Sequence, residues 1–298
     1  MRADDFRCGT ATIVGRPNVG KSTLLNRLVG QKVSITASKP QTTRHRIGGV
    51  LSREDAQIVF MDTPGIHRDR RSAMSRYLNR TAHGAVDGVD VVIFMVEAPR
   101  WTDEDEDVRR ALRESCGPVL LVPNKIDRLA GRADLLPYLE RFQGEDEFEE
   151  IIPVSARRQQ NLEVLVGQVR TRLPVAPAMF PPDALTDRSE RFLAGELVRE
   201  KLTRKLDQEL PYRLAVEIER FRREKRLLRI GAVVWVERPR QKGIVIGKGG
   251  RVLKAVGEEA RANMESLFGS RVHLDIWVKA RAGWPNDEKV LRGLGYDG

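Results

Sequence analysis

Lys21 and Ser22 end a glycine-rich stretch whose residue types and spacing suit the binding of a polyphosphate. The stretch reads Gly15-Arg16-Pro17-Asn18-Val19-Gly20-Lys21-Ser22 and is followed by Thr23. Glycines at both ends let successive backbone N–H groups point inward at phosphate oxygens. The Lys21 ammonium can reach the β- and γ-phosphates, and the Ser22 hydroxyl can bind Mg²⁺. The pattern therefore predicts a phosphate-binding loop.

An acidic residue, Asp62, follows the apolar run 57–61 and begins the sequence Asp62-Thr63-Pro64-Gly65-Ile66. A phosphate-loop protein places its second contact to Mg²⁺ at the end of such a strand, so Asp62 is a candidate, acting through a water molecule. The backbone N–H of Gly65 can meet the γ-phosphate. A plain strand followed by a Pro-Gly turn is the alternative.

The polar segment 31–46 lies between these two motifs and lacks the periodicity of a helix or strand, which predicts a loop. A loop of this length in a compact domain is usually functional or disordered. It contains Lys39-Pro40-Gln41-Thr42-Thr43-Arg44. One interpretation is a switch that closes over Mg²⁺ and the γ-phosphate through a threonine hydroxyl, and the other is a plain surface loop.

A third motif, Asn124-Lys125-Ile126-Asp127, suits the recognition of guanine. The Asp127 carboxylate can accept from both N1–H and the exocyclic amine of guanine, whereas adenine has neither donor on that edge. A hydrogen bond to a charged group contributes about 1.5–3 kcal/mol. Asn124 can contact the base and brace neighbouring loops, and the stem of Lys125 can lie over the ring. A backbone N–H at Ser155 or Ala156 can donate to guanine O6.

The motifs fall at the ends of apolar runs that alternate with helical segments. Strands are expected over 11–14, 47–51, 57–61, 89–96, 119–123 and 151–154. Helices are expected over 24–29, 103–115 and 161–173, the last capped by Asn161. This alternation predicts an α/β fold, a P-loop NTPase with a mostly parallel sheet covered by helices on both faces. Ligands of such sheets bind at the carboxyl ends of the strands.

The second half of the chain follows a proline-rich linker and has a different pattern. Helices are expected over 188–206, from the end of the segment 242–251 to about 268, and over 286–294. Strands are expected over 213–220, 227–237 and 272–278. Gly247-Lys248-Gly249-Gly250 joins two helical segments. Such a loop admits a nucleic-acid backbone, as in a KH domain, although a glycine turn between helices is the alternative. The candidate RNA contacts are Ile246, Gly247, Lys248, Gly249, Gly250, Arg251 and Lys254.

The overall charge agrees with a polyanionic partner. The 298 residues carry a formal net charge of +10, with 52 Lys and Arg against 42 Asp and Glu. Residues 175–298 hold 25 basic and 18 acidic residues, a net of +7, which leaves +3 for residues 1–174.

The two cysteines, Cys8 and Cys116, allow neither a disulfide framework nor a zinc cluster. No signal peptide or membrane-spanning run is expected, which indicates a cytoplasmic protein.

Together these motifs resemble the Era family of GTPases, which assist assembly of the small ribosomal subunit. The resemblance runs from about Thr10 to Tyr296 and includes Asp275-Ile-Trp-Val-Lys279. It implies a Ras-like GTPase domain over 1–173, a linker over 174–184 and a type II KH domain over 185–298. It also implies a monomer that binds GTP or GDP with Mg²⁺ and contacts the 3′ end of small-subunit rRNA. Loose association with the inner face of the membrane is compatible with this family.

The resemblance also assigns roles in catalysis. Water would attack the γ-phosphate in line, with Lys21, Mg²⁺ and loop N–H groups stabilising the transition state and Gly65 assisting. Ser22 and Thr43 would bind Mg²⁺ directly. Ile66 stands where Ras-like proteins have a glutamine that orients the water, which predicts slow intrinsic turnover. Asn18 suggests K⁺ as an additional cation.

Two departures from the expected pattern are small: Glu97 replaces an aspartate, and Pro123 precedes the guanine motif. Two other function classes also fit parts of the sequence. A small-molecule P-loop kinase would explain the phosphate loop but neither the guanine motif nor the KH pattern. A passive RNA-binding scaffold with a structural nucleotide would explain both halves without turnover.

Overall fold

The computed structural model describes residues 5–293 apart from 38, 40–41, 65–76, 78–80, 82–83, 85–87, 114–116, 143, 145 and 208. The chain forms two compact units. The first contains residues 1–34, 43–68 and 78–187, and the second contains residues 35–42, 69–77 and 188–298.

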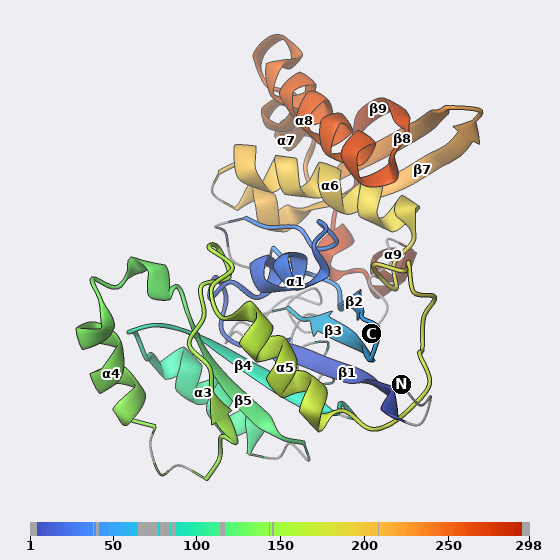
Figure 1. Ribbon diagram of the computed structural model, residues 1–298. Coiled ribbons are helices and arrows are strands. Elements are labelled where there is room, and N and C mark those ends of the chain that lie inside the picture. Colours follow the sequence, from blue (N-terminus) through green and yellow to red (C-terminus); the bar gives the residue numbers. More distant parts are fainter. Residues whose placement is uncertain are drawn as a thin grey trace. The chain divides into compact units, whose positions relative to one another are not determined.

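The first unit is built on a mixed sheet with the order β2-β3-β1-β4-β5-β6 (Figure 1). Its strands are β1 (Arg7–Val14), β2 (Ile47–Ser52), β3 (Ala56–Asp62), β4 (Val91–Glu97), β5 (Val119–Asn124) and β6 (Glu150–Ile151). Among these strands, only the pairing of β2 with β3 is antiparallel. The parallel strands therefore end at one edge of the sheet, and this edge carries the phosphate loop, Asp62 and Asn124.

The central strands of this sheet are buried because helices cover its faces. The helices are α1 (Lys21–Val29), α3 (Asp103–Leu112), α4 (Arg132–Glu140) and α5 (Leu162–Arg172). Alternate residues of β4, Val92, Phe94 and Val96, share a core with Val108 of α3 and Tyr138 of α4. Because successive side chains of a strand point to opposite faces, the intervening residues of β4 face the other way. Helix α1 contacts β2 and β3.

Helix α3 has a well-defined start that matters for the site. The Thr102 side chain accepts from the Asp105 backbone N–H, and the Asp105 carboxylate accepts from the Thr102 backbone N–H at 3.0 Å, which forms a capping box. Asp105 is fully buried, and its Oδ2 also accepts from the Thr102 hydroxyl at 2.8 Å. The acidic residues of this first turn suit the positive end of the helix dipole.

The second unit packs helices against one face of a three-stranded sheet of order β7-β8-β9. Its elements are α6 (Glu190–Lys205), β7 (Leu214–Glu224), β8 (Leu227–Val236), α7 (Pro239–Ile246), α8 (Arg251–Phe268), β9 (Arg271–Ala280) and α9 (Glu288–Gly293). Strands β7 and β8 pair antiparallel, and β8 and β9 pair parallel. Helices α6 and α8 contact each other, and they contact β7 and β9 respectively (Figure 1).

The segment 35–42 belongs to the second unit and is held there by α6. The Thr36 backbone N–H donates to Glu200 Oε1 at 3.0 Å, and Arg204 donates to the Thr36 carbonyl oxygen at 2.7 Å. Lys39 forms an ion pair of 3.1 Å with Asp207. The described residues of 31–46 form no helix or strand, as the sequence predicted.

Three local predictions differ from the structure. Helix α4 was not predicted, because Pro137 interrupts a short apolar segment without clear helical spacing. Strand β6 has two residues, although the backbone of Ile152 and Val154 still donates to β5. Asn161 occupies the N-cap of α5, but its side chain makes no capping bond. Its backbone is left-handed, and its side-chain amide donates to the Pro153 carbonyl oxygen instead.

None of the helices in the described part of the chain combines the length and the apolar composition required to cross a lipid bilayer.

Candidate nucleotide-binding site and nucleic-acid interface

The phosphate loop connects the end of β1 to the start of α1 through three residues of positive φ. These are Gly15 at 150°, Asn18 at 64° and Gly20 at 114°. A Cβ atom on Gly15 would lie 2.2 Å from the Met95 carbonyl oxygen of the neighbouring strand. The glycine is therefore required both by its conformation and by its close approach to β4. Gly20 is the N-cap of α1, so the free N–H groups of this helix start at the loop.

The Lys21 ammonium lies inside this loop. Its Nζ donates to the carbonyl oxygens of Gly15 at 2.7 Å and Arg16 at 3.0 Å. Burial lowers the pKa of Lys21 to about 8, and this effect exceeds the opposing attraction of the Asp62 carboxylate. A buried ammonium that is costly to keep charged gains most from a nearby anion, which is what a phosphate group supplies.

Ser22, Thr43 and Asp62 come together although they lie on three separate segments. The hydroxyl oxygens of Ser22 and Thr43 are 2.9 Å apart, and the Thr43 hydroxyl donates to Asp62 Oδ2 at 3.3 Å. Asp62 is fully buried, and its Oδ1 has no hydrogen-bond partner among the described residues. Burial raises the pKa of Asp62, against the lowering effect of its hydroxyl neighbours and Lys21.

These three side chains fit a magnesium ion. Hydroxyl and carboxylate oxygens are the ligand types that Mg²⁺ takes in proteins. The Oδ1 atom of Asp62, which no described residue contacts by a hydrogen bond, is a buried acceptor that a cation or its bound water would satisfy. Thr42 is less suitable than Thr43, because its hydroxyl donates to the Lys39 carbonyl oxygen at 2.6 Å.

Ser34 is a residue of this cluster that sequence reasoning missed. Its hydroxyl donates to Asp62 Oδ2 at 2.7 Å, and it is buried. Nearby, Asn26 of α1 fixes the backbone of Ser34 by accepting from its N–H at 2.9 Å and donating to its carbonyl oxygen at 2.7 Å. A serine in an aperiodic loop carries no signal by itself, so only the spatial arrangement identifies it.

Asn124 joins the loops around the guanine motif. Its Nδ2 donates to the Val19 carbonyl oxygen of the phosphate loop at 2.7 Å, and its Oδ1 accepts from the Ala156 N–H at 3.0 Å. The Ser155 N–H donates to the Gln160 carbonyl oxygen at 3.2 Å. Both N–H groups that the sequence offers to guanine O6 thus already have partners in the protein, and their contact with the base stays a prediction.

The Asp127 carboxylate is oriented by Ser155. The Ser155 hydroxyl donates to Asp127 Oδ1 at 2.6 Å, and this hydrogen bond is the main reason that the pKa of Asp127 is lowered. The carboxylate is therefore ionised at neutral pH and keeps its other oxygen for a further donor.

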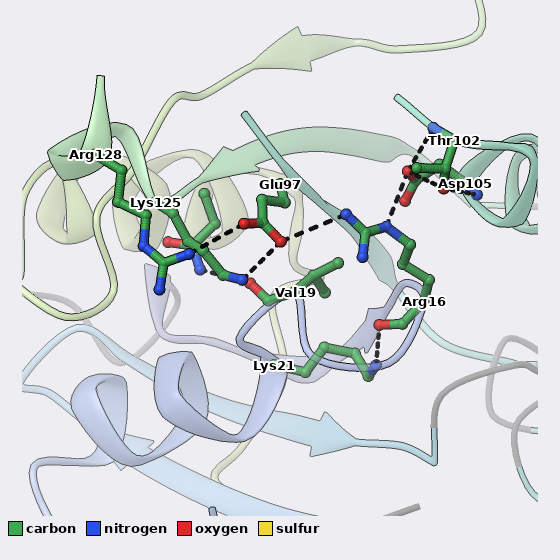
Figure 2. Close-up of polar contacts among 9 residues, drawn as sticks. Arg16, Val19, Lys21, Glu97, Thr102, Asp105, Lys125 and Arg128 are labelled. Atoms are coloured by element: carbon green, nitrogen blue, oxygen red, sulfur yellow. Dashed lines mark hydrogen bonds and ion pairs between the residues drawn. The ribbon is translucent and has the colours of Figure 1, made fainter. Parts of the chain in front are cut away.

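Glu97 connects the phosphate loop to the guanine motif (Figure 2). Its carboxylate accepts from Lys125 Nζ at 2.7 Å, from Arg128 at 3.2 Å and from Arg16 at 3.5 Å. Burial alone would raise its pKa, but the hydrogen bond and charge of Lys125, with the charges of Arg16 and Arg128, lower the pKa of Glu97 overall. Arg16 is also held by the buried Asp105, whose Oδ2 accepts from Nε at 3.0 Å.

The candidate nucleic-acid interface is the loop between α7 and α8. Gly247, Gly249 and Gly250 have φ values of 75°, 63° and 77°. A Cβ atom on Gly247 would lie 2.5 Å from Val252 Cγ2, whereas Gly249 and Gly250 have open space around them. Lys248, Gly249, Arg251 and Lys254 are exposed, Ile246 is half-buried, and α8 starts directly at the loop. The exposed basic side chains and helix N–H groups form a surface that suits phosphates.

Two of the predicted site residues, Gly65 and Ile66, lie outside the described residues. Thr63 and Pro64 precede them, and the Thr63 hydroxyl donates to the Ile13 carbonyl oxygen at 3.0 Å. Ile126 lies in a short 3₁₀ turn that also contains Asp127. Pro17 is half-buried and Thr23 lies in the first turn of α1.

Comparison with known proteins agrees with this division of sites. The family model described as "50S ribosome-binding GTPase" matches residues 10–125, and the "KH domain" model matches residues 209–285. GTPase Era of Stenotrophomonas maltophilia strain R551-3 is 52% identical over 290 residues, covering 97% of each chain. GTPase Era of Xanthomonas oryzae pv. oryzae strain MAFF 311018 is 52% identical over 297 residues, covering 100% of this chain and 99% of the relative.

The chain belongs to the Era family of GTPases. Two solved Era structures also resemble it closely. One is Era in complex with MgGDPNP and nucleotides 1506–1542 of 16S ribosomal RNA, with a TM-score of 0.94 and 37% identity, covering 98% of this chain and all of the other. The second is a single-substitution variant of Aquifex aeolicus Era bound to GDP·AlF4⁻, with a TM-score of 0.93 and 36% identity over the same share of each chain. The Era resemblance and the fold class predicted from the sequence are confirmed.

Proposed function

We propose that this protein is a GTP-hydrolysing switch that binds the 3′ end of small-subunit rRNA and assists assembly of the small ribosomal subunit. The observation that carries the enzymatic part is the convergence of Ser22, Thr43 and Asp62 beside the buried Lys21. The RNA-binding part is supported by the exposed basic loop between α7 and α8 and by the Era structure that contains 16S rRNA.

The nucleotide ligands in this proposal are GTP and GDP. The phosphate loop, residues 15–23, binds the phosphates, while Asn124, Lys125 and Asp127 bind the base together with the backbone at Ser155 and Ala156. Residues 62–66 complete the site next to the γ-phosphate, with the Gly65 N–H as a catalytic contact. Ser22, Thr43 and Asp62 hold Mg²⁺, which when bound neutralises charge on the phosphate oxygens.

Within this site each described side chain has a separate task. Lys21 stabilises charge that develops on the β- and γ-phosphates, because its ammonium lies in a buried position where electrostatic interactions are strong. Asn124 keeps the phosphate loop and the 155–156 loop at a fixed separation through its two hydrogen bonds. Asp127 selects guanine through its carboxylate, which Ser155 orients by a hydrogen bond to Oδ1.

The domain boundaries proposed are 1–173 for the Ras-like domain, 174–184 for the linker and 185–298 for the type II KH domain.

The protein acts as a monomer in the cytoplasm, with loose contact at the inner face of the membrane as an additional location. Fractionation of cells expressing the tagged chain would test this location, since recovery only in an integral membrane fraction would contradict it.

The RNA partner is tested by crosslinking GTP-loaded protein to RNA in cell extract and sequencing the attached fragments. We expect fragments from the 3′ end of small-subunit rRNA, lost in Gly249→Asp. Gly249 has open space and a positive φ that aspartate and asparagine tolerate better than most residues, so the loop should keep its shape. Gly249→Asn is the matched control, because it adds the same bulk without the charge.

The outcomes of this experiment separate the competing partners. Fragments from large-subunit rRNA would instead favour binding to the 50S subunit, as in the description of the family model that matches residues 10–125. Fragments scattered over many RNAs would contradict the ribosomal assignment. Equal crosslinking with GTP, GDP or no nucleotide would favour a passive scaffold, and transfer of labelled phosphate to a small molecule rather than to water would favour a kinase.

Potassium is a further cation in this proposal. Asn18 is exposed in the phosphate loop and has a left-handed backbone, so a cation from the solvent can reach it. K⁺ held there would add a fixed positive charge next to the phosphates. Phosphate release should be faster in K⁺ than in Na⁺ buffer, and Asn18→Ala should remove this difference; equal rates for the wild type would exclude the idea.

A further inference from the structure

Glu97 is the only carboxylate among the described residues whose ion pairs reach both the phosphate loop and the guanine motif. It is the last residue of β4, and the parallel register of β4 and β5 places it beside Asn124. The Ala98 N–H donates to the Asn124 carbonyl oxygen at 2.9 Å, which fixes the two strand ends together. The position of Glu97 is therefore set by the sheet and not by a loop.

The three cations around Glu97 are not equivalent. The side chains of Arg16 and Lys125 are 14% and 18% exposed, whereas that of Arg128 is 61% exposed. An exposed ion pair contributes little because water screens it, so the contact with Arg128 at 3.2 Å should matter least. The partly buried contacts of Arg16 and Lys125 are the ones that can position other groups.

Arg16 and Lys125 are themselves next to groups that would touch the nucleotide. The Arg16 carbonyl oxygen accepts from Lys21 Nζ at 3.0 Å, and its guanidinium bridges Glu97 and the buried Asp105 at the start of α3 (Figure 2). Lys125 has a left-handed backbone, with φ of 68°, and directs its ammonium to Glu97 at 2.7 Å. A lysine side chain that must be ordered on binding costs up to about 1.5–2 kcal/mol, and an ion pair formed beforehand removes part of this cost.

We propose that Glu97 is a positioning residue for guanine nucleotide binding, which holds the stem of Lys125 in place for the base and links it through Arg16 to the phosphate loop. This inference rests on the proposed function, since it assumes that Lys125 lies against the base. Glutamate is required because one carboxylate must reach both cations. The shorter side chain of an aspartate at this position would have to give up one of them or shift the strand end.

The test measures the dissociation of a fluorescent GDP analogue from the full chain and the steady-state hydrolysis of GTP. We expect Glu97→Gln to raise the dissociation rate constant and KM by about tenfold, because hydrogen bonds to charged groups are worth more than neutral ones. We expect kcat to stay within about twofold, because the substitution leaves Lys21, Thr43 and Asp62 in place at the phosphates. Glu97→Asp should give an intermediate effect, and Arg128→Gln is the matched control expected to bind normally.

A double-mutant cycle separates positioning from a general structural role. Lys125→Met keeps the alkyl stem but removes the ammonium that Glu97 holds. If Glu97 acts through Lys125, Glu97→Gln adds little to the effect of Lys125→Met, whereas independent effects would multiply. The preference for GDP over IDP should not change in Glu97→Gln, because Asp127, and not Lys125, reads the exocyclic amine.

Three results would overturn the proposal. Normal GDP dissociation in folded Glu97→Gln, multiplied effects in the double variant, or an equal loss in Arg128→Gln would each contradict it. Circular dichroism and thermal melting of every variant show whether the fold is intact, and Glu97→Asp keeps the test informative if Glu97→Gln does not fold. Failure of the proposed function looks different, since the wild type itself would then neither bind the GDP analogue nor release phosphate from GTP.

Discussion

The hydroxyl of Ser34 donates a hydrogen bond of 2.7 Å to Oδ2 of Asp62, and both residues are buried. Asp62 Oδ2 also accepts from Thr43, so two hydroxyl groups are directed at one carboxylate oxygen while Oδ1 is left without a described partner. This arrangement fixes the orientation of the carboxylate and leaves Oδ1 available to a magnesium ion or to its bound water. Ser34 is therefore expected to support the magnesium site without being a ligand itself.

Ser34→Ala should raise the Mg²⁺ concentration needed for half-maximal GTP hydrolysis by about tenfold, because second-layer partners of metal ligands typically contribute that much to metal affinity. The measurement is a Mg²⁺ titration of phosphate release at saturating GTP. Ser34→Thr retains the hydroxyl and should stay within about twofold of the wild type. An unchanged Mg²⁺ requirement in Ser34→Ala would show that the bond has no effect on the metal.

Asp127→Asn should shift nucleotide preference from guanine to xanthine. The substitution replaces a carboxylate that accepts two hydrogen bonds from guanine with an amide that both donates and accepts. The loss of one charge-assisted bond lowers GTP affinity by about ten- to a hundredfold. Competition between GTP and XTP for the fluorescent GDP site measures the change. The base assignment is wrong if the variant still prefers GTP as strongly as the wild type.

The same experiment has a useful control in Ser155. Its hydroxyl holds Asp127 Oδ1 at 2.6 Å and is assigned no contact with the guanine donors. Ser155→Ala should therefore weaken GTP binding without producing xanthine preference. If it also changed base selectivity, the orientation of Asp127 and not its charge would be the determining property.

Gly15→Ala should destabilise the first unit strongly. The added Cβ would lie 2.2 Å from the Met95 carbonyl oxygen, and the φ of 150° is unfavourable for alanine. Backbone strain of this type costs about 1–3 kcal/mol, and the displacement of β4 adds to it. Gly30→Ala is the matched control in the same unit, because Gly30 has a φ of 78° but a Cβ atom there would meet no other atom within 4 Å. Its cost is the conformational contribution alone, about 1–2 kcal/mol.

Urea denaturation followed by tryptophan fluorescence and by hydrogen exchange of β4 amides would measure both variants. The larger effect should be in Gly15→Ala, accompanied by faster exchange in β4. Equal effects of the two substitutions would mean that the chain relieves the contact with Met95 without displacing the strand.

The sequence contained enough information to place the nucleotide motifs, because each follows an apolar run. Asp62 and Asn124 lie at the last positions of β3 and β5, and the parallel sheet brings both to the same edge. The pattern could not identify Ser34 or the bridging role of Glu97, since these depend on contacts between distant segments. Helix α4 was missed because a short segment containing Pro137 depends on packing of Tyr138 against the core and not on local propensity.

The pH dependence of stability offers a test of the Glu97 cluster that needs no nucleotide. Although burial opposes it, the cations around Glu97 lower its pKa below the ordinary value of 4.5. A carboxyl group whose pKa is lower in the folded state binds fewer protons there than in the unfolded chain, so its contribution to stability is present at neutral pH and is lost as the pH falls through the folded pKa. The difference in unfolding free energy between the wild type and Glu97→Gln should therefore be constant from pH 8 to pH 6 and decrease below about pH 4.5. Urea titrations at these pH values would measure it, with Arg128→Gln as the comparison, and a difference that grows on acidification would contradict the ion pairs seen around Glu97.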